Sequence, residues 1–340
     1  MLPESDVMDK TRKKINDGNE VNQKSSQFKI LNVMIKRREF LKKSGAAALG
    51  SLLVSNELNA MFFRKTYPVG LQLFTFFNQI DEDVPGTLKK IAGIGYKEIE
   101  SAFSKKGGYY GMKPKEFSKL LSDLGMSWKS HHVIGAPFKM PANAKPITDA
   151  NGNPITFPPM RNLRENMEEL VDEIAEAGIP YLVCANTPTK TADEMKSSIE
   201  VLNKTGEACK KANIILAYHN HTEEFEKPEE QSETAYDMFL LQLSPDIKME
   251  LDLCWATKAG VDPVELFRKN PGRFHLWHVK DLNKEKTGPA PVGEGIIDFK
   301  RIFENADVAG MKHFFVEHDM PRDPYASITT SYNNLKKIMS

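Results

Sequence analysis

The chain has 340 residues, of which 40% are hydrophobic and 27% charged, a composition typical of a globular protein with a large core. Lysine plus arginine and aspartate plus glutamate each number 46, so the formal charge is zero and no basic surface is expected to bind nucleic acid. The three cysteines, Cys184, Cys209 and Cys254, are odd in number and lack CxxC spacing. A disulfide framework and a zinc–thiolate site are therefore disfavoured.

The N-terminal part, residues 1–65, differs in composition from residues 66–340. Residues 1–35 are polar and lack apolar periodicity, so we expect them to be disordered. A basic segment with adjacent arginines follows at 36–42, and then the weakly apolar stretch 44–54. This order of segments resembles a twin-arginine export signal, with an ordinary basic helix start as the alternative.

The apolar stretch is too short to span a bilayer, so no stable membrane insertion is expected. The chain is instead expected to be exported, to the periplasm or otherwise outside the cytoplasm, with the twin-arginine export machinery as a partner. Such signals begin at the N-terminus, and Met34 lies just before the basic segment. The translation start is therefore left open between Met1 and Met34.

From residue 67 onward, apolar runs of strand length alternate with segments of helical length. The predicted strands are 69–74, 97–100, 128–133, 181–185, 214–219, 248–252, 274–279 and 313–317. The predicted helices are 84–92, 114–124, 160–177, 192–212, 233–243, 263–268, 299–306 and 325–339. This rhythm predicts an α/β fold of the (β/α)8 TIM-barrel type, a single domain over residues 66–340. An open doubly wound sheet is the rival, but no glycine-rich phosphate loop follows the first strand.

The last four predicted strands each end in a side chain that can bind a metal: His219, Asp252, His278 and Glu317. Because consecutive strands of such a fold are parallel, these ends meet at one side of the sheet. The alternation of side chains along a strand lets all four point into the barrel. Two imidazoles and two carboxylates that converge in this way predict a site for one divalent ion, with Mn²⁺, Mg²⁺ and Zn²⁺ as candidates.

Short motifs occur in a fixed order along residues 67–340. They are GLQL at 70–73, YHNH at 218–221 with EF at 224–225, LD at 251–252, HVKD at 278–281, GEG at 293–295 and VE at 316–317. In this order they resemble the xylose isomerase-like TIM barrels, also called the sugar phosphate isomerase/epimerase superfamily, in an exported subgroup with a YHNH motif. The resemblance implies metal ligands at the ends of the last four strands, commonly Glu, Asp, His and Glu. This chain departs from that pattern at His219, and His221 or Glu224 are the alternatives for the first ligand.

The resemblance also implies proton transfer beside a carbonyl. In that reaction, a metal bound to a carbonyl and a neighbouring hydroxyl oxygen stabilises the enediolate that forms when the intervening proton leaves. We expect acid, base or charge-stabilising roles for Glu317, His219, Lys280, Glu100 and His132. We expect substrate contacts from Gln72, His221, Glu224, Trp255 and Glu294.

The function predicted from these residues is a metal-dependent sugar isomerase or epimerase. An unphosphorylated sugar or keto-sugar is expected, because the loop 288–298 contains no lysine or arginine to bind a phosphate. The alternative is a lyase or dehydratase that eliminates a group beta to a ketone, for example from a 3-keto-glycoside, and a non-catalytic sugar-binding barrel is a third interpretation. The long segment 135–159 is expected to form a lid over the site, and the resemblance allows a homodimer.

Overall fold

The computed structural model describes residues 67–138, 154 and 160–340. The expectations for the export signal at residues 1–65 lie outside these residues, as does most of the expected lid at 135–159. Contacts group Tyr67–Ser340 into one unit. In the described part of the chain, no helix is long and apolar enough to cross a membrane.

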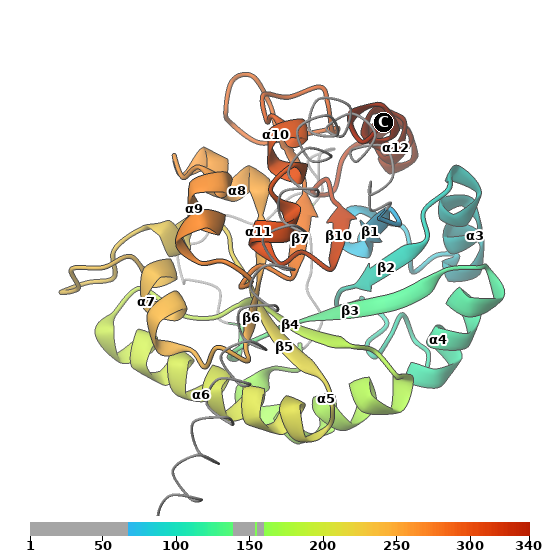
Figure 1. Cartoon of the computed structure of the whole chain (residues 1–340). Helices are drawn as coiled ribbons and strands as arrows, with labels where there is room; N and C mark the ends of the chain where they lie inside the picture. Colours follow the sequence, from blue (N-terminus) through green and yellow to red (C-terminus); the bar gives the residue numbers. More distant parts are fainter. Residues whose placement is uncertain (1–66, 139–153, 155–159) are drawn as a thin grey trace, which may run out of the picture. The chain divides into compact units, whose positions relative to one another are not determined.

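Eight parallel strands close into a barrel (Figure 1), which confirms the predicted (β/α)8 TIM-barrel fold. The barrel strands are β1 (Gly70–Gln72), β2 (Glu98–Ser101), β3 (Ser127–Ile134), β4 (Tyr181–Asn186), β5 (Ile215–His219), β6 (Lys248–Asp252), β7 (Leu276–Val279) and β10 (His313–Val316). The first strand pairs with the last, with Gly70 beside Phe315, and this pairing closes the barrel. A small antiparallel pair, β8 (Asp281–Leu282) and β9 (Pro289–Ala290), follows β7.

Helices surround the barrel on its outside (Figure 1). They are α3 (Val84–Ile94), α4 (Pro114–Asp123), α5 (Leu163–Ala177), α6 (Ala192–Lys211), α7 (Ala235–Gln242), α8 (Leu253–Lys258), α9 (Pro263–Lys269), α10 (Phe299–Phe303), α11 (Ala306–Ala309) and α12 (Pro324–Ile338). Two 3₁₀ turns, η1 (Leu73–Phe76) and η2 (Glu223–Phe225), follow β1 and β5. The helix predicted at 299–306 is divided into α10 and α11, and the other predicted helices are present with shifted ends.

Two polar side chains at strand ends set boundaries that the apolar pattern does not show. The sequence predicts a first strand reaching residue 74, but β1 ends at Gln72, whose side chain accepts a hydrogen bond from the Phe74 backbone N–H at 3.0 Å and begins η1. The short helix α8 is not predicted at all. It begins because Asp252 accepts from the Trp255 backbone N–H at 3.0 Å, a typical N-cap contact.

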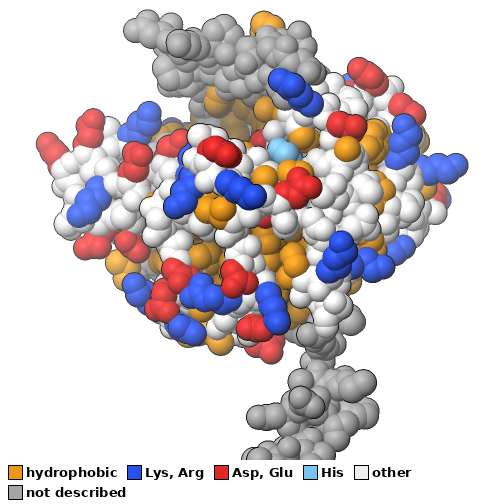
Figure 2. All heavy atoms as spheres, turned by 90° about the horizontal axis from the view of Figure 1, so that it is seen from above, with side chains coloured by type: hydrophobic (Ala, Val, Ile, Leu, Met, Phe, Trp, Pro, Cys, Tyr) orange, Lys and Arg blue, Asp and Glu red, His pale blue; other side chains and the backbone are white. Residues whose placement is uncertain are grey.

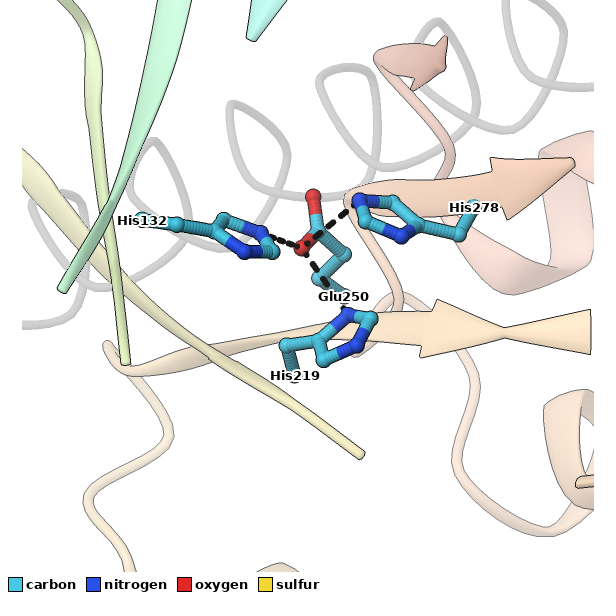
Figure 3. A group of neighbouring side chains, drawn as sticks. All are labelled: His132, His219, Glu250 and His278. Atoms are coloured by element: carbon cyan, nitrogen blue, oxygen red, sulfur yellow. Dashed lines mark hydrogen bonds and ion pairs between the residues drawn. The ribbon is translucent and has the colours of Figure 1, made fainter. Parts of the chain in front are cut away.

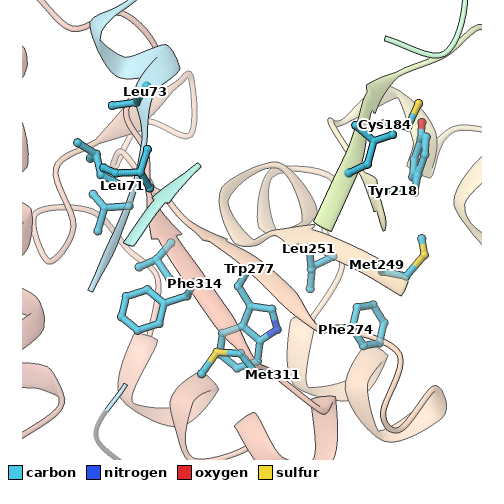
Figure 4. Close-up of a cluster of buried hydrophobic side chains, with 14 of the residues drawn as sticks. Leu71, Leu73, Cys184, Tyr218, Met249, Leu251, Phe274, Trp277, Met311 and Phe314 are labelled. Carbon is cyan, nitrogen blue, oxygen red and sulfur yellow. The ribbon is translucent and has the colours of Figure 1, made fainter. Parts of the chain in front are cut away.

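The main core lies between the strands and the helices. Outward-facing strand residues such as Leu251, Trp277 and Phe314 are fully buried there (Figure 4), and the ring of Trp277 stacks on Phe267 of α9 with centroids 4.9 Å apart. A second, small cluster fills the inside of the barrel, with members Tyr181, Val183, Ala217, Leu276 and Phe315. Burial of these apolar side chains is the main favourable contribution to folding.

The surface and the cysteines agree with the composition of the chain. On the face shown in Figure 2, acidic and basic side chains are interspersed with apolar ones. All three cysteines are buried and unpaired, as expected for a chain without a disulfide framework.

Candidate active site

The C-terminal ends of the barrel strands carry a buried set of titratable side chains, which we call the polar layer. It consists of Glu100 on β2, His132 on β3, His219 on β5, Glu250 and Asp252 on β6, His278 on β7, Lys280 just after β7, and Glu317 just after β10. Active sites of TIM barrels lie at this end of the strands. Inward-facing side chains from six different strands therefore meet in one place.

Three histidines surround one carboxylate in the inner part of the polar layer (Figure 3). Glu250 Oε2 lies 2.6 Å from His132 Nε2, 3.2 Å from His219 Nδ1 and 3.3 Å from His278 Nε2. The ligand atoms of these four residues all lie within 4.8 Å of one another. We call them the inner group, and their donor atoms are close enough to share one metal ion.

A second set, the outer group, consists of Asp252, His278 and Glu317, whose ligand atoms also lie within 4.8 Å of one another. His278 Nδ1 lies 2.8 Å from Glu317 Oε2 and 3.7 Å from Asp252 Oδ2. The four ligands that the sequence predicts thus fall into two overlapping groups. His278 belongs to both, whereas His219 belongs to the inner group.

Lys280 lies among the carboxylates of the outer group. Only 1% of its side chain is exposed, and its Nζ lies 3.0 Å from Asp252, 2.6 Å from Glu317 and 3.1 Å from Asp319. Burial would raise the pKa of Glu317, but the Lys280 and His278 charges hold it well below its usual range. Burial would lower the pKa of Lys280, but the three carboxylates raise it well above its usual range. The lysine is therefore charged and paired.

Two glutamates of the polar layer have opposite pKa shifts. Burial raises the pKa of Glu250 well above its usual range, and the nearby Glu100 carboxylate raises it further. Burial acts in the same direction on Glu100, but the charges of His132 and His278 outweigh it and hold that pKa well below the usual range. Burial, followed by the charge of His278, lowers the pKa of His219. The two neighbouring carboxyl groups thus have pKa values shifted in opposite directions, a pattern found where an acid and a base lie side by side.

Glu100 is fixed in place by the side chains of Gln72 and Ser130, in addition to its contact with His278 Nε2. Gln72 Nε2 donates to Glu100 Oε1 at 2.7 Å, and Ser130 Oγ donates to Glu100 Oε2 at 2.5 Å. The sequence assigns Gln72 to substrate contacts. Its side chain is fully buried, and its amide is occupied by Glu100 and by the backbone of Phe74, so Gln72 orients Glu100.

The other predicted substrate residues lie in different surroundings. Glu224 is buried, and its carboxylate accepts hydrogen bonds from Tyr218 Oη at 2.8 Å and the His221 backbone N–H at 2.7 Å, so it holds the turn after β5. Glu294 is exposed on the loop after β9. Asp281 accepts three backbone N–H groups of that loop, at residues 293, 295 and 297, and fixes its course.

His221 and Trp255 are the predicted substrate residues that have free polar atoms beside the polar layer. The ring of His221 lies 4.9 Å from that of His219 and 6.5 Å from that of Trp255. Among the described residues, His221 Nδ1 and Trp255 Nε1 are buried atoms without a hydrogen-bond partner. A polar atom buried in this way costs free energy unless something pairs with it. Both atoms are therefore suited to bind the hydroxyl groups of a substrate.

A cavity of about 140 Å³ borders the polar layer at His132. Its lining includes Phe103, His131, Met160 and Arg161. The volume is that of roughly one six-membered ring, since an engineered protein cavity of about 150 Å³ holds benzene. The cavity lies beside the end of β3 and includes His132 of the polar layer in its lining.

The sequence interpretation misses two residues of the site. Glu250 precedes Asp252 by two positions, so it lies on the same inward face of β6, and strand alternation applied one step further would have found it. Asp319 lies beyond the end of β10, where strand alternation gives no information. Attention to the last residue of each strand therefore identifies the outer group and misses the carboxylate at the centre of the inner group.

The fold and the position of the polar layer define the chain as a TIM barrel with its titratable residues at the catalytic end of the strands. The family described as xylose isomerase-like TIM barrel matches residues 88–338. The chain belongs to this family, as its motifs indicate.

Individual relatives and solved structures resemble the chain at low sequence identity. An inosose dehydratase from Geobacillus thermodenitrificans is 25% identical over 244 residues, which cover 62% of this chain and 74% of the relative. Two crystal structures of sugar phosphate isomerase/epimerases from Parabacteroides distasonis are 27% and 26% identical, with TM-scores of 0.62 and 0.65. The matched regions cover 79% and 81% of this chain, and 93% and 100% of the two crystallised chains.

Proposed function

We propose that the chain is a metal-dependent sugar isomerase or epimerase that removes a proton next to a carbonyl of an unphosphorylated sugar or keto-sugar. The observation that carries the proposal is the polar layer, in which two groups of potential metal ligands lie beside an ionised glutamate and a buried lysine. Membership of the family and the names of the two Parabacteroides distasonis proteins support the same reaction class.

The residues present fit a divalent metal ion. Glu250 Oε1, Asp252 Oδ2 and His219 Nδ1 are buried atoms without a hydrogen-bond partner among the described residues, and buried polar atoms are normally paired. Imidazole nitrogens and carboxylate oxygens from the two groups are suitable ligands. When bound, such an ion supplies Lewis-acid polarisation of a substrate oxygen.

The chain's own residues supply the proton transfer and the binding. Glu317 is ionised and held by His278 at 2.8 Å and Lys280 at 2.6 Å, so we assign it the role of base. Lys280 carries a fixed positive charge that stabilises negative charge developing on a neighbouring oxygen of the substrate. Trp255 Nε1 and His221 Nδ1 bind substrate hydroxyls and orient the sugar.

The charge of the polar layer supports an unphosphorylated substrate. Lys280 is already paired with three carboxyl groups, and Glu100 and Glu250 add two more acidic groups nearby. A phosphate group would enter a site with more acidic than basic side chains, where like charges repel. A neutral sugar meets no such penalty.

A dehydratase is the second candidate, because the relative from Geobacillus thermodenitrificans is named as an inosose dehydratase. Elimination begins with the same removal of a proton next to a carbonyl. It differs only in the departure of a hydroxyl or alkoxyl group from the next carbon. The same base and the same buried lysine serve both reactions.

Proton exchange in D₂O separates these reactions. The full chain is incubated with free hexoses, an inosose and 3-keto-glycosides, and deuterium uptake and released groups are followed by NMR and mass spectrometry. Deuterium uptake with an isomerised or epimerised product supports the first reaction, whereas loss of water or of an aglycone supports elimination.

The variant that tests the base is Glu317→Gln, which keeps the shape of the side chain and removes the carboxylate. It should slow exchange by at least about 100-fold, the usual contribution of general base catalysis. Exchange at the wild-type rate in this variant contradicts the role given to Glu317. Absence of exchange with every substrate contradicts both reactions and leaves the sugar-binding barrel.

A further inference from the structure

We propose that the metal ion is held by the inner group, His132, His219, Glu250 and His278, in place of the strand-end carboxylates. The assignment rests on the proposed function for the presence of a metal, and it names which residues bind that metal and which metal they favour. On β6 the assigned metal ligand is Glu250, two residues before the strand-end Asp252.

The donor atoms of the inner group are spaced as the ligands of one metal ion are. In a tetrahedral zinc site with metal–ligand distances of about 2.0–2.1 Å, neighbouring donor atoms lie about 3.3 Å apart. His219 Nδ1 and His278 Nε2 lie 3.2 and 3.3 Å from Glu250 Oε2, and His132 Nε2 lies at 2.6 Å. Small movements of these side chains are sufficient to place all four donors around one ion.

The two ring nitrogens of His278 have different partners. Nδ1 lies 2.8 Å from Glu317 Oε2, whereas Nε2 points toward Glu250 and Glu100. Metal-binding histidines almost always donate the hydrogen of their other ring nitrogen to a carboxylate, a carbonyl or water, which fixes the tautomer. If Nδ1 donates to Glu317, Nε2 can bind a metal once it loses the hydrogen that it shares with Glu100 Oε1 at 2.5 Å. Glu317 thus orients a ligand.

Lys280 occupies the space that a metal in the outer group would need. Its Nζ lies 3.0 Å from Asp252 Oδ2 and 2.6 Å from Glu317 Oε2. A divalent cation bound to the same two oxygens would lie within a few ångströms of an ammonium group and be repelled by it. The contacts of Glu250 are instead with imidazoles, which are neutral when they bind a metal.

Unpaired buried atoms also favour the inner group. Glu250 Oε1 and His219 Nδ1 have no hydrogen-bond partner among the described residues, and leaving such atoms unpaired is costly. Asp252 Oδ2 also lacks a partner with hydrogen-bond geometry, but Lys280 lies 3.0 Å away and compensates its charge. One metal ion in the inner group pairs His219 Nδ1.

The donor set indicates which metal is bound. Three imidazole nitrogens and one carboxylate oxygen are typical of Zn²⁺, whereas Mg²⁺ and Mn²⁺ prefer sites made of oxygen ligands. We therefore expect zinc to bind more tightly than either of these ions.

The test is the zinc content and zinc affinity of the full chain, measured by elemental analysis and by competition with a chromophoric chelator. The wild-type chain should hold one zinc ion. Glu250→Gln should weaken zinc binding by more than about 100-fold, since even the loss of a residue that only orients a ligand costs about 10–100-fold. Asp252→Asn is the matched control on the same face of the same strand and should change affinity by less than about tenfold.

X-ray absorption spectroscopy of the zinc-loaded wild-type chain needs no variant, so the test survives if Glu250→Gln does not fold. Scattering from three imidazoles supports the inner group, and scattering from one or two imidazoles with oxygen ligands overturns it. Zinc retained by Glu250→Gln but lost by Asp252→Asn also overturns the assignment and leaves the proposed reaction standing. A chain that holds zinc in the inner group but exchanges no proton in any sugar overturns the proposed function alone.

Discussion

Replacing the buried lysine measures how much the outer carboxylates depend on it. The Nζ of Lys280 lies 3.0, 2.6 and 3.1 Å from carboxylate oxygens of Asp252, Glu317 and Asp319. Lys280→Met keeps most of the side-chain volume and removes the positive charge that lies nearest to each of these carboxylates. Removing one partner of a buried ion pair typically costs about 3–5 kcal/mol. We expect the free energy of unfolding to fall by about this amount at neutral pH.

The size of the loss should depend on pH. In the wild-type chain the pKa of Glu317 is held low by Lys280 and His278 against the effect of burial. Its contribution to stability is therefore present above the unfolded-state pKa, about 4.3, and is lost as pH falls below it. In Lys280→Met, burial is no longer opposed by the lysine, so the carboxyl group takes up a proton more readily. The difference between the two chains should shrink between pH 7.5 and pH 5.

Reversible urea unfolding in the presence of a chelator, followed by circular dichroism, gives the free energies. The control is Lys210→Met, which removes a lysine 2.7 Å from Asp246 on the surface, where 71% and 59% of the two side chains are exposed. Surface ion pairs contribute little, so this change should have no measurable effect. Equal unfolding free energies for wild type and Lys280→Met would refute the reasoning, and so would an equal loss in the control.

Two further predictions concern stability and substrate binding. Burial, followed by the charge of Lys248, lowers the pKa of His275 to about 4. The neutral His275 therefore contributes to the free energy of unfolding above about pH 6.5, and this contribution is lost as pH falls toward 4. The loss should be about 1–2 kcal/mol after allowance for its partial exposure. Urea unfolding of His275→Gln should show a weaker pH dependence than wild type over this range. Trp255→Phe removes an unpaired indole N–H and should raise KM about tenfold with little change in kcat, as steady-state kinetics will show. An unchanged KM would remove Trp255 from the substrate contacts.

The fold could be predicted from the sequence because each barrel strand is a short apolar run and each connection has helical length. The same pattern identifies the strand ends, since a polar residue after an apolar run is visible in the sequence. It could not identify α8, whose start depends on one side-chain hydrogen bond, from Asp252 to the backbone N–H of Trp255. A contact of this kind leaves no periodic signal.

The grouping of the polar layer could not be predicted in the same way. Strand alternation states that a side chain points inward, but it does not state which ring nitrogen of His278 faces which carboxylate. It also does not show that Lys280 reaches the carboxylates of neighbouring strands, since that depends on the length and rotamer of a long side chain. The ring orientation of His278 and the reach of Lys280 decide which of the two groups can bind a metal ion. Only the three-dimensional arrangement of all the strands determines them.

Barrel closure has a consequence for the synthesis of the protein. The pairing of Gly70 with Phe315 joins the first strand to the last, so β1 leaves the ribosome long before its partner exists. Until then the growing chain has unpaired strand edges at both sides of the sheet, which are sites for association with other chains. Glu317 directly follows β10 and reaches His278 only when that strand is in place. Completion of the barrel and completion of the polar layer are thus one event, and a chain that stops short of β10 gains neither.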